Sequence, residues 1–441
     1  MKKLDILKDP NPLLREQAQP VESFDGATQE LIDNMVYTMR QADGIGLAAP
    51  QIGELKQIIV GEFESEDEKD NTFPLTVVVN PKILNLSKEK IFMLEGCLSF
   101  PGKELYIKRP KEIEIEAQDR WGKPVKIKSG NLFSRVLQHE IDHLNGLLMI
   151  DHIKTVKTIF IGNGTLGVFV LEKIFNDPQF KLLEVISGKP KPAGRGRELK
   201  DTPIGVKSME LGVKIFRSDG LNRQEAISHI RSLSPEMIVL ADFNEVISRE
   251  ILDIPKYGVI NVHPSLLPKF RGPSPIVSAI LAGEKKTGVS LILMNEKIDA
   301  GDILAQIHIR IKSRETAEQL KIRLAEISAD LLAEAVPYYL AGEISPIKQK
   351  EEKATSTSII SKSDGELIGN EAPEVVDRMV RALLPWPGVY QVVSGRKIFI
   401  TKAHLDKEKK LVIDRVKPEG KNDMQYSDFC RGNSDRLIFS E

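Results

Sequence analysis

The sequence predicts a multidomain protein of mixed class: an α+β unit, then a doubly wound parallel α/β sheet, then a small OB-like β-barrel. The chain has 441 residues, which at about 150 residues per domain predicts about three domains. Strands and helices are mixed without regular order up to residue 155, and they alternate regularly after residue 157. Residues 348–363 are charged and rich in Ser and Thr, as is typical of a linker.

The first predicted domain spans residues 1–155. Residues 28–42 have helical spacing, with Leu31, Met35 and Met39 on one face, and residues 131–148 return to the same spacing. Between the two helices, short apolar runs predict strands at 57–60, 76–79, 112–116 and 125–127.

The second predicted domain, at 156–345, contains apolar runs that indicate strands buried on both faces, as in a parallel sheet. These strands are expected at 158–161, 182–186, 213–216, 237–241, 259–262 and 289–294. A long amphipathic helix at 314–340 follows. We expect a linker at 346–370 and a C-terminal barrel domain at 371–441, with Trp386 in its core.

Composition excludes several classes of protein. The 62 basic and 63 acidic residues give a net charge of −1, so the chain is not a globally basic nucleic-acid binder. Two cysteines exclude a disulfide framework. The polar N-terminus does not resemble a signal peptide, and no apolar stretch reaches the length of a membrane span. We therefore expect a cytoplasmic protein with no membrane partner and no DNA partner.

Residues 139–143 read His-Glu-Ile-Asp-His, a metal-binding pattern when helical. His139 and His143 would project from the same face, one turn apart, although an exposed polar helix turn is the alternative. A catalytic metal usually keeps three protein ligands and an open position. Cys97, in Glu-Gly-Cys-Leu-Ser, is the candidate third ligand, while a lone cysteine is often a small buried residue.

A third segment, Gly-Ile-Gly-Leu-Ala-Ala-Pro-Gln at 44–51, suits a loop that admits a substrate backbone. In this order the three segments resemble the peptide deformylase family over residues 1–155. The resemblance implies three metal ligands, one residue that transfers protons and two oxyanion donors: Cys97, His139 and His143, then Glu140, then Gln51 and the Leu98 backbone N–H.

This resemblance also implies hydrolysis of the formyl group of N-formylmethionyl peptides, as they emerge at the ribosome. A bound divalent metal would lower the pKa of a water molecule. Members of the family commonly use Fe(II), which is the first expectation here. Zinc or nickel are the alternatives, since a thiolate ligand also suits zinc.

The run Gly-Asn-Gly-Thr-Leu-Gly at 162–167 matches the dinucleotide-binding pattern between a strand and a helix. A dinucleotide site also needs an acidic residue at the end of the next strand. Glu184 lies inside that strand instead, so the sequence does not favour NAD binding.

A second cluster is predicted where the strand at 259–262 ends, since ligand sites of open α/β sheets lie at the carboxyl ends of strands. Asn261 and His263 are two residues apart on that strand, so both side chains can point to the same face. Asp299 follows the next strand. Taken one at a time, each residue is also explained without a function, His263 as a hydrogen-bonded strand-end histidine and Asp299 as a turn carboxylate.

The motifs Asn-Val-His-Pro-Ser-Leu-Leu-Pro at 261–268 and Asp-Ala-Gly-Asp-Ile at 299–303 resemble the formyltetrahydrofolate-dependent formyltransferases. This resemblance implies that Asn261 and His263 stabilise an oxyanion and that Asp299 orients His263. The formyl donor would be 10-formyltetrahydrofolate. Its binding is implied for a run of four residues, Ser265, Leu266, Leu267 and Pro268.

The accepting amine is suggested by a basic loop at 189–200, which is otherwise explained as a solvated loop. It resembles the tRNA-contacting loop of methionyl-tRNA formyltransferases, which implies initiator methionyl-tRNA as partner and Arg195 and Arg197 as contacts. The run at 381–388 resembles the second domain of that family.

Two alternatives remain for the C-terminal half. In the first alternative, this half formylates another amine, such as an amino sugar nucleotide. In the second, it is only an RNA-binding module. The second alternative is motivated by Ala241-Asp242-Phe243, which departs from the family's usual Ala-Tyr-Gly.

Overall fold

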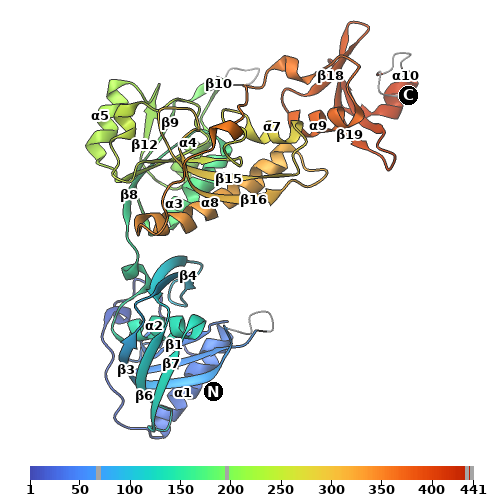
Figure 1. Cartoon of the computed structure of the whole chain (residues 1–441). Coiled ribbons are helices and arrows are strands. Elements are labelled where there is room, and N and C mark those ends of the chain that lie inside the picture. Colours follow the sequence, from blue (N-terminus) through green and yellow to red (C-terminus); the bar gives the residue numbers. More distant parts are fainter. Residues whose placement is uncertain (66–70, 194–197, 433–436, 438–441) are drawn as a thin grey trace. The chain divides into compact units, whose positions relative to one another are not determined.

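The computed structural model describes residues 1–65, 71–193, 198–432 and 437 (Figure 1). The chain forms two compact units, Met1–Lys154 and Thr155–Glu441. Among the described residues, no helix combines the length and the apolar character needed to cross a bilayer.

The first unit is built on an antiparallel sheet of five strands in the order β1-β2-β3-β6-β7, beside a separate hairpin of β4 and β5. The strands of the sheet are β1 (Gly46–Ala48), β2 (Ile58–Phe63), β3 (Phe73–Leu86), β6 (Ile113–Gln118) and β7 (Pro124–Ser129). The hairpin strands are β4 (Lys90–Gly96) and β5 (Glu104–Pro110). The helices are α1 (Gly26–Gln41) and α2 (Asn131–Leu144), with short 3-10 turns η1 (Pro12–Arg15), η2 (Ala49–Ile52) and η4 (Met149–His152).

The two helices of this unit pack on opposite faces of the sheet because successive residues of β2 point in opposite directions. Ile58 and Val60 pack in the cluster that contains α1, whereas Ile59 packs in the cluster that contains α2. Both predicted helices and the four predicted strands are confirmed, while β1, β4 and β5 were not predicted. β1 is only three residues long, too short for a periodic signal.

The second unit contains a seven-stranded sheet in the order β12-β9-β8-β13-β14-β15-β16. Its strands are β8 (Val156–Gly162), β9 (Phe180–Gly188), β12 (Ile215–Ser218), β13 (Met237–Ala241), β14 (Val259–His263), β15 (Lys286–Leu293) and β16 (Asp302–Arg310). The strands from β12 to β14 are parallel, as predicted. The expectation of a parallel strand at 289–294 is wrong, because β15 pairs antiparallel with both β14 and β16.

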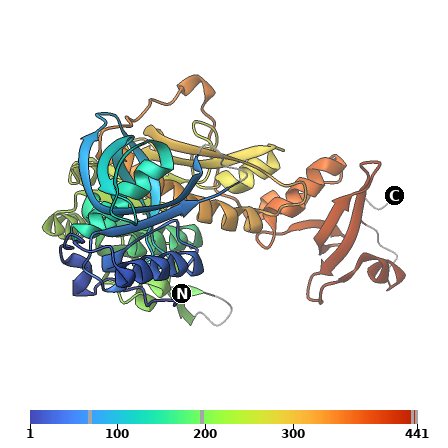
Figure 2. The same ribbon diagram turned by 90° about the horizontal axis from the view of Figure 1, so that it is seen from below.

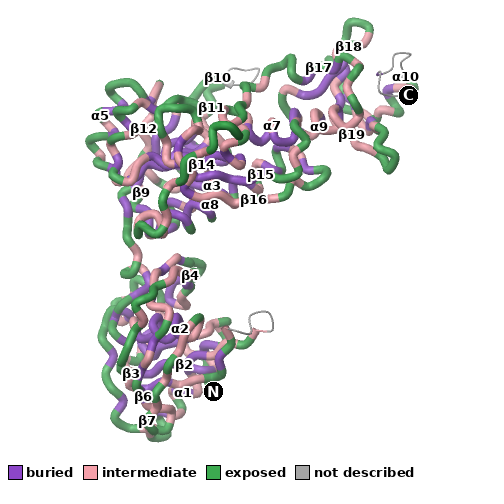
Figure 3. The backbone as a smooth tube through the Cα atoms, viewed as in Figure 1, coloured by how far each residue is buried: buried purple, intermediate pink, exposed green. Residues whose placement is uncertain are grey.

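Helices cover both faces of this sheet, as predicted from strands buried on both faces. The central strands β13 and β14 are buried along their whole length, and Figure 3 draws buried residues in purple. Phe160 of β8 packs in the cluster that contains α3 and α8, and its neighbours Ile159 and Ile161 pack in the cluster that contains α5 and α6. The helices are α3 (Thr165–Asn176), α4 (Pro203–Glu210), α5 (Gln224–Leu233), α6 (Arg249–Leu252), α7 (Pro275–Leu281) and α8 (Ala317–Leu340). A two-stranded ribbon pairs β10 (Lys191–Ala193) with β11 (Glu198–Lys200).

The C-terminal part, drawn in orange and red in Figure 2, carries a five-stranded and mainly antiparallel sheet. Its elements are η5 (Glu351–Lys353), η6 (Lys362–Gly365), β17 (Glu366–Leu367), α9 (Pro373–Leu383), β18 (Val389–Val393), β19 (Arg396–Leu405), β20 (Leu411–Pro418), β21 (Met424–Gln425) and α10 (Tyr426–Gly432). The expectation that Trp386 is a core residue is wrong, since its side chain is 56% exposed. Leu383 and Val389, on either side of this turn, are fully buried and occupy the core instead.

Candidate active sites

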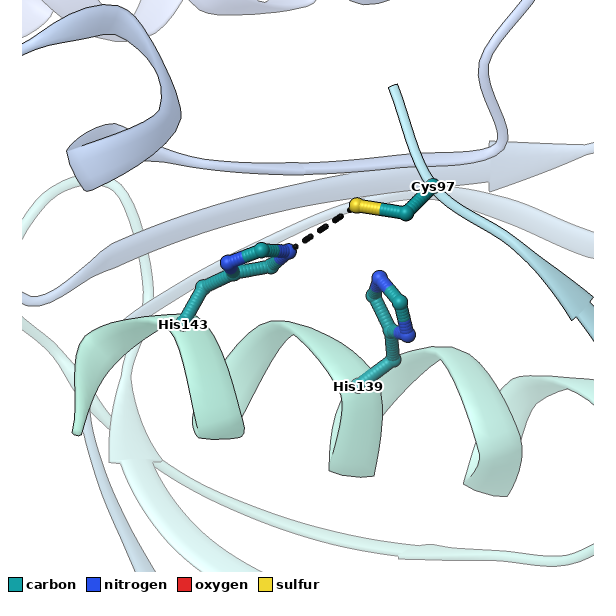
Figure 4. A group of neighbouring side chains, drawn as sticks. All are labelled: Cys97, His139 and His143. Carbon is teal, nitrogen blue, oxygen red and sulfur yellow. Dashed lines mark hydrogen bonds between the residues drawn. The ribbon is translucent and has the colours of Figure 1, made fainter. Parts of the chain in front are cut away.

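Helix α2 brings the two predicted histidine ligands to the same side, one turn apart, with ring centroids 5.0 Å from each other. Cys97 follows β4, and its Sγ lies 3.3 Å from Nε2 of His143 (Figure 4). The candidate ligand atoms of Cys97, His139 and His143 all lie within 4.8 Å of one another. One thiolate and two imidazoles are a donor set for a transition metal, so these residues fit a metal ion.

Glu95 holds the second nitrogen of His139, with Oε2 3.1 Å from Nδ1. Burial would raise the pKa of Glu95, but the hydrogen bond to His139 and the charge of Arg109 hold it well below its usual range. A carboxylate only accepts hydrogen bonds, so Nδ1 carries the proton and the Nε2 lone pair of His139 is available for a metal.

Two buried arginines hold Glu95 in turn. Arg109 donates to both carboxylate oxygens at 2.7 and 3.1 Å, and Arg135 donates to Oε1 at 2.8 Å. Arg109 also pairs with Asp142, whose carboxylate lies 2.7 Å from Nε2 of His152. Sequence reasoning missed this supporting network, although Glu95 lies within the motif that identified Cys97.

Glu140 is 4% exposed, and its Oε2 has no hydrogen-bond partner among the residues that the structure describes. Burial raises the pKa of Glu140 to about 7. A carboxyl group with such a pKa can both take and give a proton near neutral pH. Gly46 makes room for it, because a Cβ on Gly46 would lie 2.4 Å from Oε1 of Glu140.

Gln51 lies beside the candidate metal ligands. Its Oε1 accepts from the backbone N–H of Ala48 at 2.8 Å, so its amide nitrogen faces Cys97 Sγ at 3.6 Å and Ser99 Oγ at 3.3 Å. Leu98 directly follows Cys97, and its carbonyl accepts from Lys8. The structure thus brings Gln51 to the three candidate metal ligands, and Leu98 adjoins them through Cys97.

The second predicted trio is also brought together, at the carboxyl end of β14 and in the turn between β15 and β16. Asn261 donates to Oδ1 of Asp299 at 3.0 Å, and Nδ1 of His263 lies 3.6 Å from Oδ2. Asn261 and His263 are 7% and 4% exposed. The backbone N–H of Gly272 donates to Oδ2 of Asp299 at 2.8 Å.

The other nitrogen of His263, Nε2, lies 2.9 Å from the carbonyl oxygen of Phe270. A carbonyl only accepts, so Nε2 carries a proton and Nδ1 is the nitrogen on the Asp299 side. Asp299 and Phe270 adopt left-handed backbone conformations, with φ of 47° and 62°, which are strained for residues other than glycine.

The four residues predicted to bind the formyl donor lie directly after β14. The Ser265 hydroxyl donates to the Lys269 carbonyl at 2.8 Å, and the Leu267 N–H donates to Ser290 at 3.1 Å. Both residues are buried, while Leu266 and Pro268 are partly exposed.

The glycine-rich turn before α3 is filled by Asp242. Its Oδ2 accepts from the Leu166 N–H at 3.2 Å, and a Cβ on Gly164 would lie 1.8 Å from the same oxygen. An internal carboxylate therefore occupies the helix N-terminus that would bind a pyrophosphate. This gives a physical reason for the prediction against NAD binding. Glu184, inside β9, pairs with His229.

The predicted tRNA contacts Arg195 and Arg197 lie outside the described residues. Within the second unit, a cleft of about 650 Å³ lies between the α/β part and the C-terminal part. Six basic and three acidic side chains line it, the basic ones being Lys285, Lys286, Arg310, Lys312, Arg378 and Arg381. Sequence reasoning missed this cleft, because its basic residues come from separate segments.

The fold and the two clusters define the class of the protein: an enzyme that joins a metallohydrolase-like unit to an α/β transferase-like unit. A polypeptide deformylase family model matches residues 3–158, a formyl transferase model matches residues 156–336, and a formyl transferase C-terminal domain model matches residues 359–411. The chain belongs to the methionyl-tRNA formyltransferase family through its second unit and carries a peptide deformylase domain before it, which confirms the predicted fusion.

Individual relatives are similar to each part. Methionyl-tRNA formyltransferase of Bacillus thuringiensis is 33% identical over 306 residues, covering 64% of this chain and 97% of the relative. The crystal structure of peptide deformylase from Ehrlichia chaffeensis is 36% identical and covers 35% of this chain and 89% of that one, with a TM-score of 0.34. That of Thermotoga maritima is 38% identical and covers 35% and 99%, with a TM-score of 0.32.

Proposed function

We propose that the chain removes the formyl group from N-formylmethionyl peptides at one site and transfers a formyl group to initiator methionyl-tRNA at the other. One observation carries this proposal: each unit gathers a complete set of chemically matched residues, Cys97, His139, His143 and Glu140 in one and Asn261, His263 and Asp299 in the other. Since these substrates belong to translation, we propose that the protein works in the cytoplasm, near the ribosome.

For the first site, we propose that Cys97, His139 and His143 bind one divalent metal, Fe(II) before zinc or nickel. When bound, the metal supplies the Lewis acidity that activates a water molecule. The support is the donor set within 4.8 Å and the proton on Nδ1 of His139, which leaves Nε2 as ligand. Three protein ligands also leave a coordination position open.

In this site Glu140 would take a proton from the water as its oxygen bonds to the formyl carbon. The same carboxyl group would then pass that proton to the amine nitrogen as the C–N bond breaks, leaving formate and a free amino terminus. The Gln51 amide and the Leu98 backbone N–H would donate to the formyl oxygen as negative charge develops on it.

For the second site, the amino nitrogen of methionyl-tRNA would attack the formyl carbon of 10-formyltetrahydrofolate. The bond from that carbon to N10 then breaks, and the proton lost by the amine goes to N10. His263 and the Asn261 amide would stabilise the oxyanion, and Asp299 would orient the His263 imidazole. We propose that Ser265, Leu266, Leu267 and Pro268 form a wall of the folate site.

We propose that the tRNA binds through the basic loop at Arg195 and Arg197 and through the basic cleft beside α9 (Pro373–Leu383). Phosphate binding needs concentrated positive charge, which a chain of net charge −1 can offer only locally. The cleft, with six basic side chains, supports this proposal.

The test is a pair of assays on the purified full-length protein. Formate release from a formylmethionyl peptide measures the first activity, and formylation of charged initiator tRNA with 10-formyltetrahydrofolate measures the second. Transfer to an amino sugar nucleotide in place of tRNA would contradict the proposed acceptor. Binding of tRNA without any transfer would reduce the second unit to an RNA-binding module.

A further inference from the structure

The segment expected as a linker, residues 346–370, contacts the second site along residues 349–357. Arg271, in the loop that follows β14, forms a parallel bridge with Ser356. Thr355 and Thr357 exchange backbone hydrogen bonds with this loop: the Arg271 N–H donates to Thr355, and the Thr357 N–H donates to Arg271, at 2.9 and 2.7 Å. The segment therefore packs against the loop that borders the second site.

Gln349 joins two sides of the site through one side-chain amide. Its nitrogen donates to the backbone carbonyls of Asp299 and Gly301 at 2.8 and 2.7 Å. Its oxygen accepts two hydrogen bonds from Arg271, at 3.0 and 2.8 Å. The turn that carries Asp299 is thus tied to the loop that carries Arg271.

Thr355 makes the matching contact on the His263 side. Its hydroxyl accepts the backbone N–H of Phe270 at 2.8 Å, and the carbonyl of Phe270 is the group that holds Nε2 of His263. The two segments also lie close together at Gly272, where an added Cβ would lie 2.9 Å from the Thr357 carbonyl oxygen.

We infer that Gln349 and Thr355 are positioning residues for formyl transfer. Asp299 and Phe270 both have left-handed backbones, which persist only where the surroundings hold them. Gln349 holds the Asp299 turn, and Thr355 holds the backbone N–H of Phe270, the residue whose carbonyl accepts from Nε2 of His263. The segment after α8 therefore orients both the carboxylate and the imidazole, an inference that rests on the proposed function of this site.

The test compares Gln349→Glu and Thr355→Val with the wild-type full-length protein in the tRNA formylation assay. Gln349→Glu keeps the partner of Arg271 but places an acceptor against two carbonyls, and Thr355→Val removes the acceptor for Phe270. Both should lower kcat about tenfold or more, with KM for folate and tRNA unchanged. Thr355→Ser keeps the hydroxyl and should restore kcat, and Ser358→Ala, in the same exposed segment, should leave it unchanged.

Each outcome is decisive. An unchanged kcat in both variants, or a loss in Thr355→Val that Thr355→Ser does not restore, would overturn the positioning role. A rise in KM alone would assign the segment to substrate binding instead, and would also overturn it. A wild-type protein without transfer activity would overturn the proposed function itself, which separates the two failures.

Discussion

Glu95 accepts a hydrogen bond from Nδ1 of His139 at 3.1 Å and so fixes which ring nitrogen meets Cys97. The carboxylate is itself held by Arg109 and Arg135, and all three charged side chains are at most 5% exposed. The orientation of His139, a candidate metal ligand, is therefore set by the buried ionic network behind it.

Glu95→Gln should weaken metal retention, because an amide oxygen accepts less strongly from Nδ1 and loses its ionic partners. The expected loss of metal affinity is about 10- to 100-fold. Metal content after dialysis against a graded chelator measures it. Glu89→Gln, at a position with a 63% exposed side chain, is the control, and equal retention in both variants would refute the role of Glu95.

Glu140→Ala should keep the metal and lose deformylation by about 100- to 10,000-fold, since Glu140 handles the proton without being a ligand. Metal analysis and formate release on the same sample check both parts. A metal-free variant would show that Glu140 holds the ion, and full activity would remove it from the proton path.

Gly46→Ala should displace Glu140 and lower deformylation by up to about 100-fold, because the added Cβ would lie 2.4 Å from the Glu140 carboxylate. Gly26→Ala is the matched control, as a Cβ there would meet no atom within 4 Å. Rates of formate release compare the two. Equal rates in both variants would mean that Glu140 tolerates the displacement or is not needed.

Arg195→Ala combined with Arg197→Ala should weaken tRNA binding and flatten its salt dependence, because fewer counterions are released. The slope against the logarithm of salt concentration should fall by about 1.4 to 1.8 for two lost phosphate contacts. Binding titrations at several salt concentrations measure this. Lys88→Ala with Lys90→Ala, exposed in the deformylase unit, should change nothing, and an unchanged slope in the arginine variant would make the loop a bystander.

Local sequence patterns predicted most of the fold and named the candidate site residues that the structure brings together. His139 and His143 are four residues apart on a helix, and this local spacing alone predicts that they share a face. Asn261 and His263 are two residues apart at a strand end, and the same kind of local spacing predicts that they lie together. The support of each site was not predictable in this way. Arg109 and Arg135 lie 14 and 40 residues from Glu95, and ion pairing leaves no periodic signal. The contacts of Gln349 and Thr355 were not predicted either, because the charged and Ser/Thr-rich composition of their segment is typical of a linker.

The antiparallel direction of β15 (Lys286–Leu293) was missed for a related reason. A strand buried on both faces has the same apolar pattern in either direction, so the pattern at 289–294 did not distinguish the two. The direction is shown only by the pairing of β15 with its two neighbours, which is antiparallel on both sides.

The central claim, two independent active sites in one chain, is tested most directly by measuring both activities in His263→Ala. Transfer to methionyl-tRNA should fall by about 100- to 1,000-fold, the usual effect of losing one oxyanion donor. Formate release from a formylmethionyl peptide should stay at the wild-type rate, because His263 and the Cys97 cluster lie in different units. Loss of both activities in a folded variant, or unchanged transfer, would contradict the account.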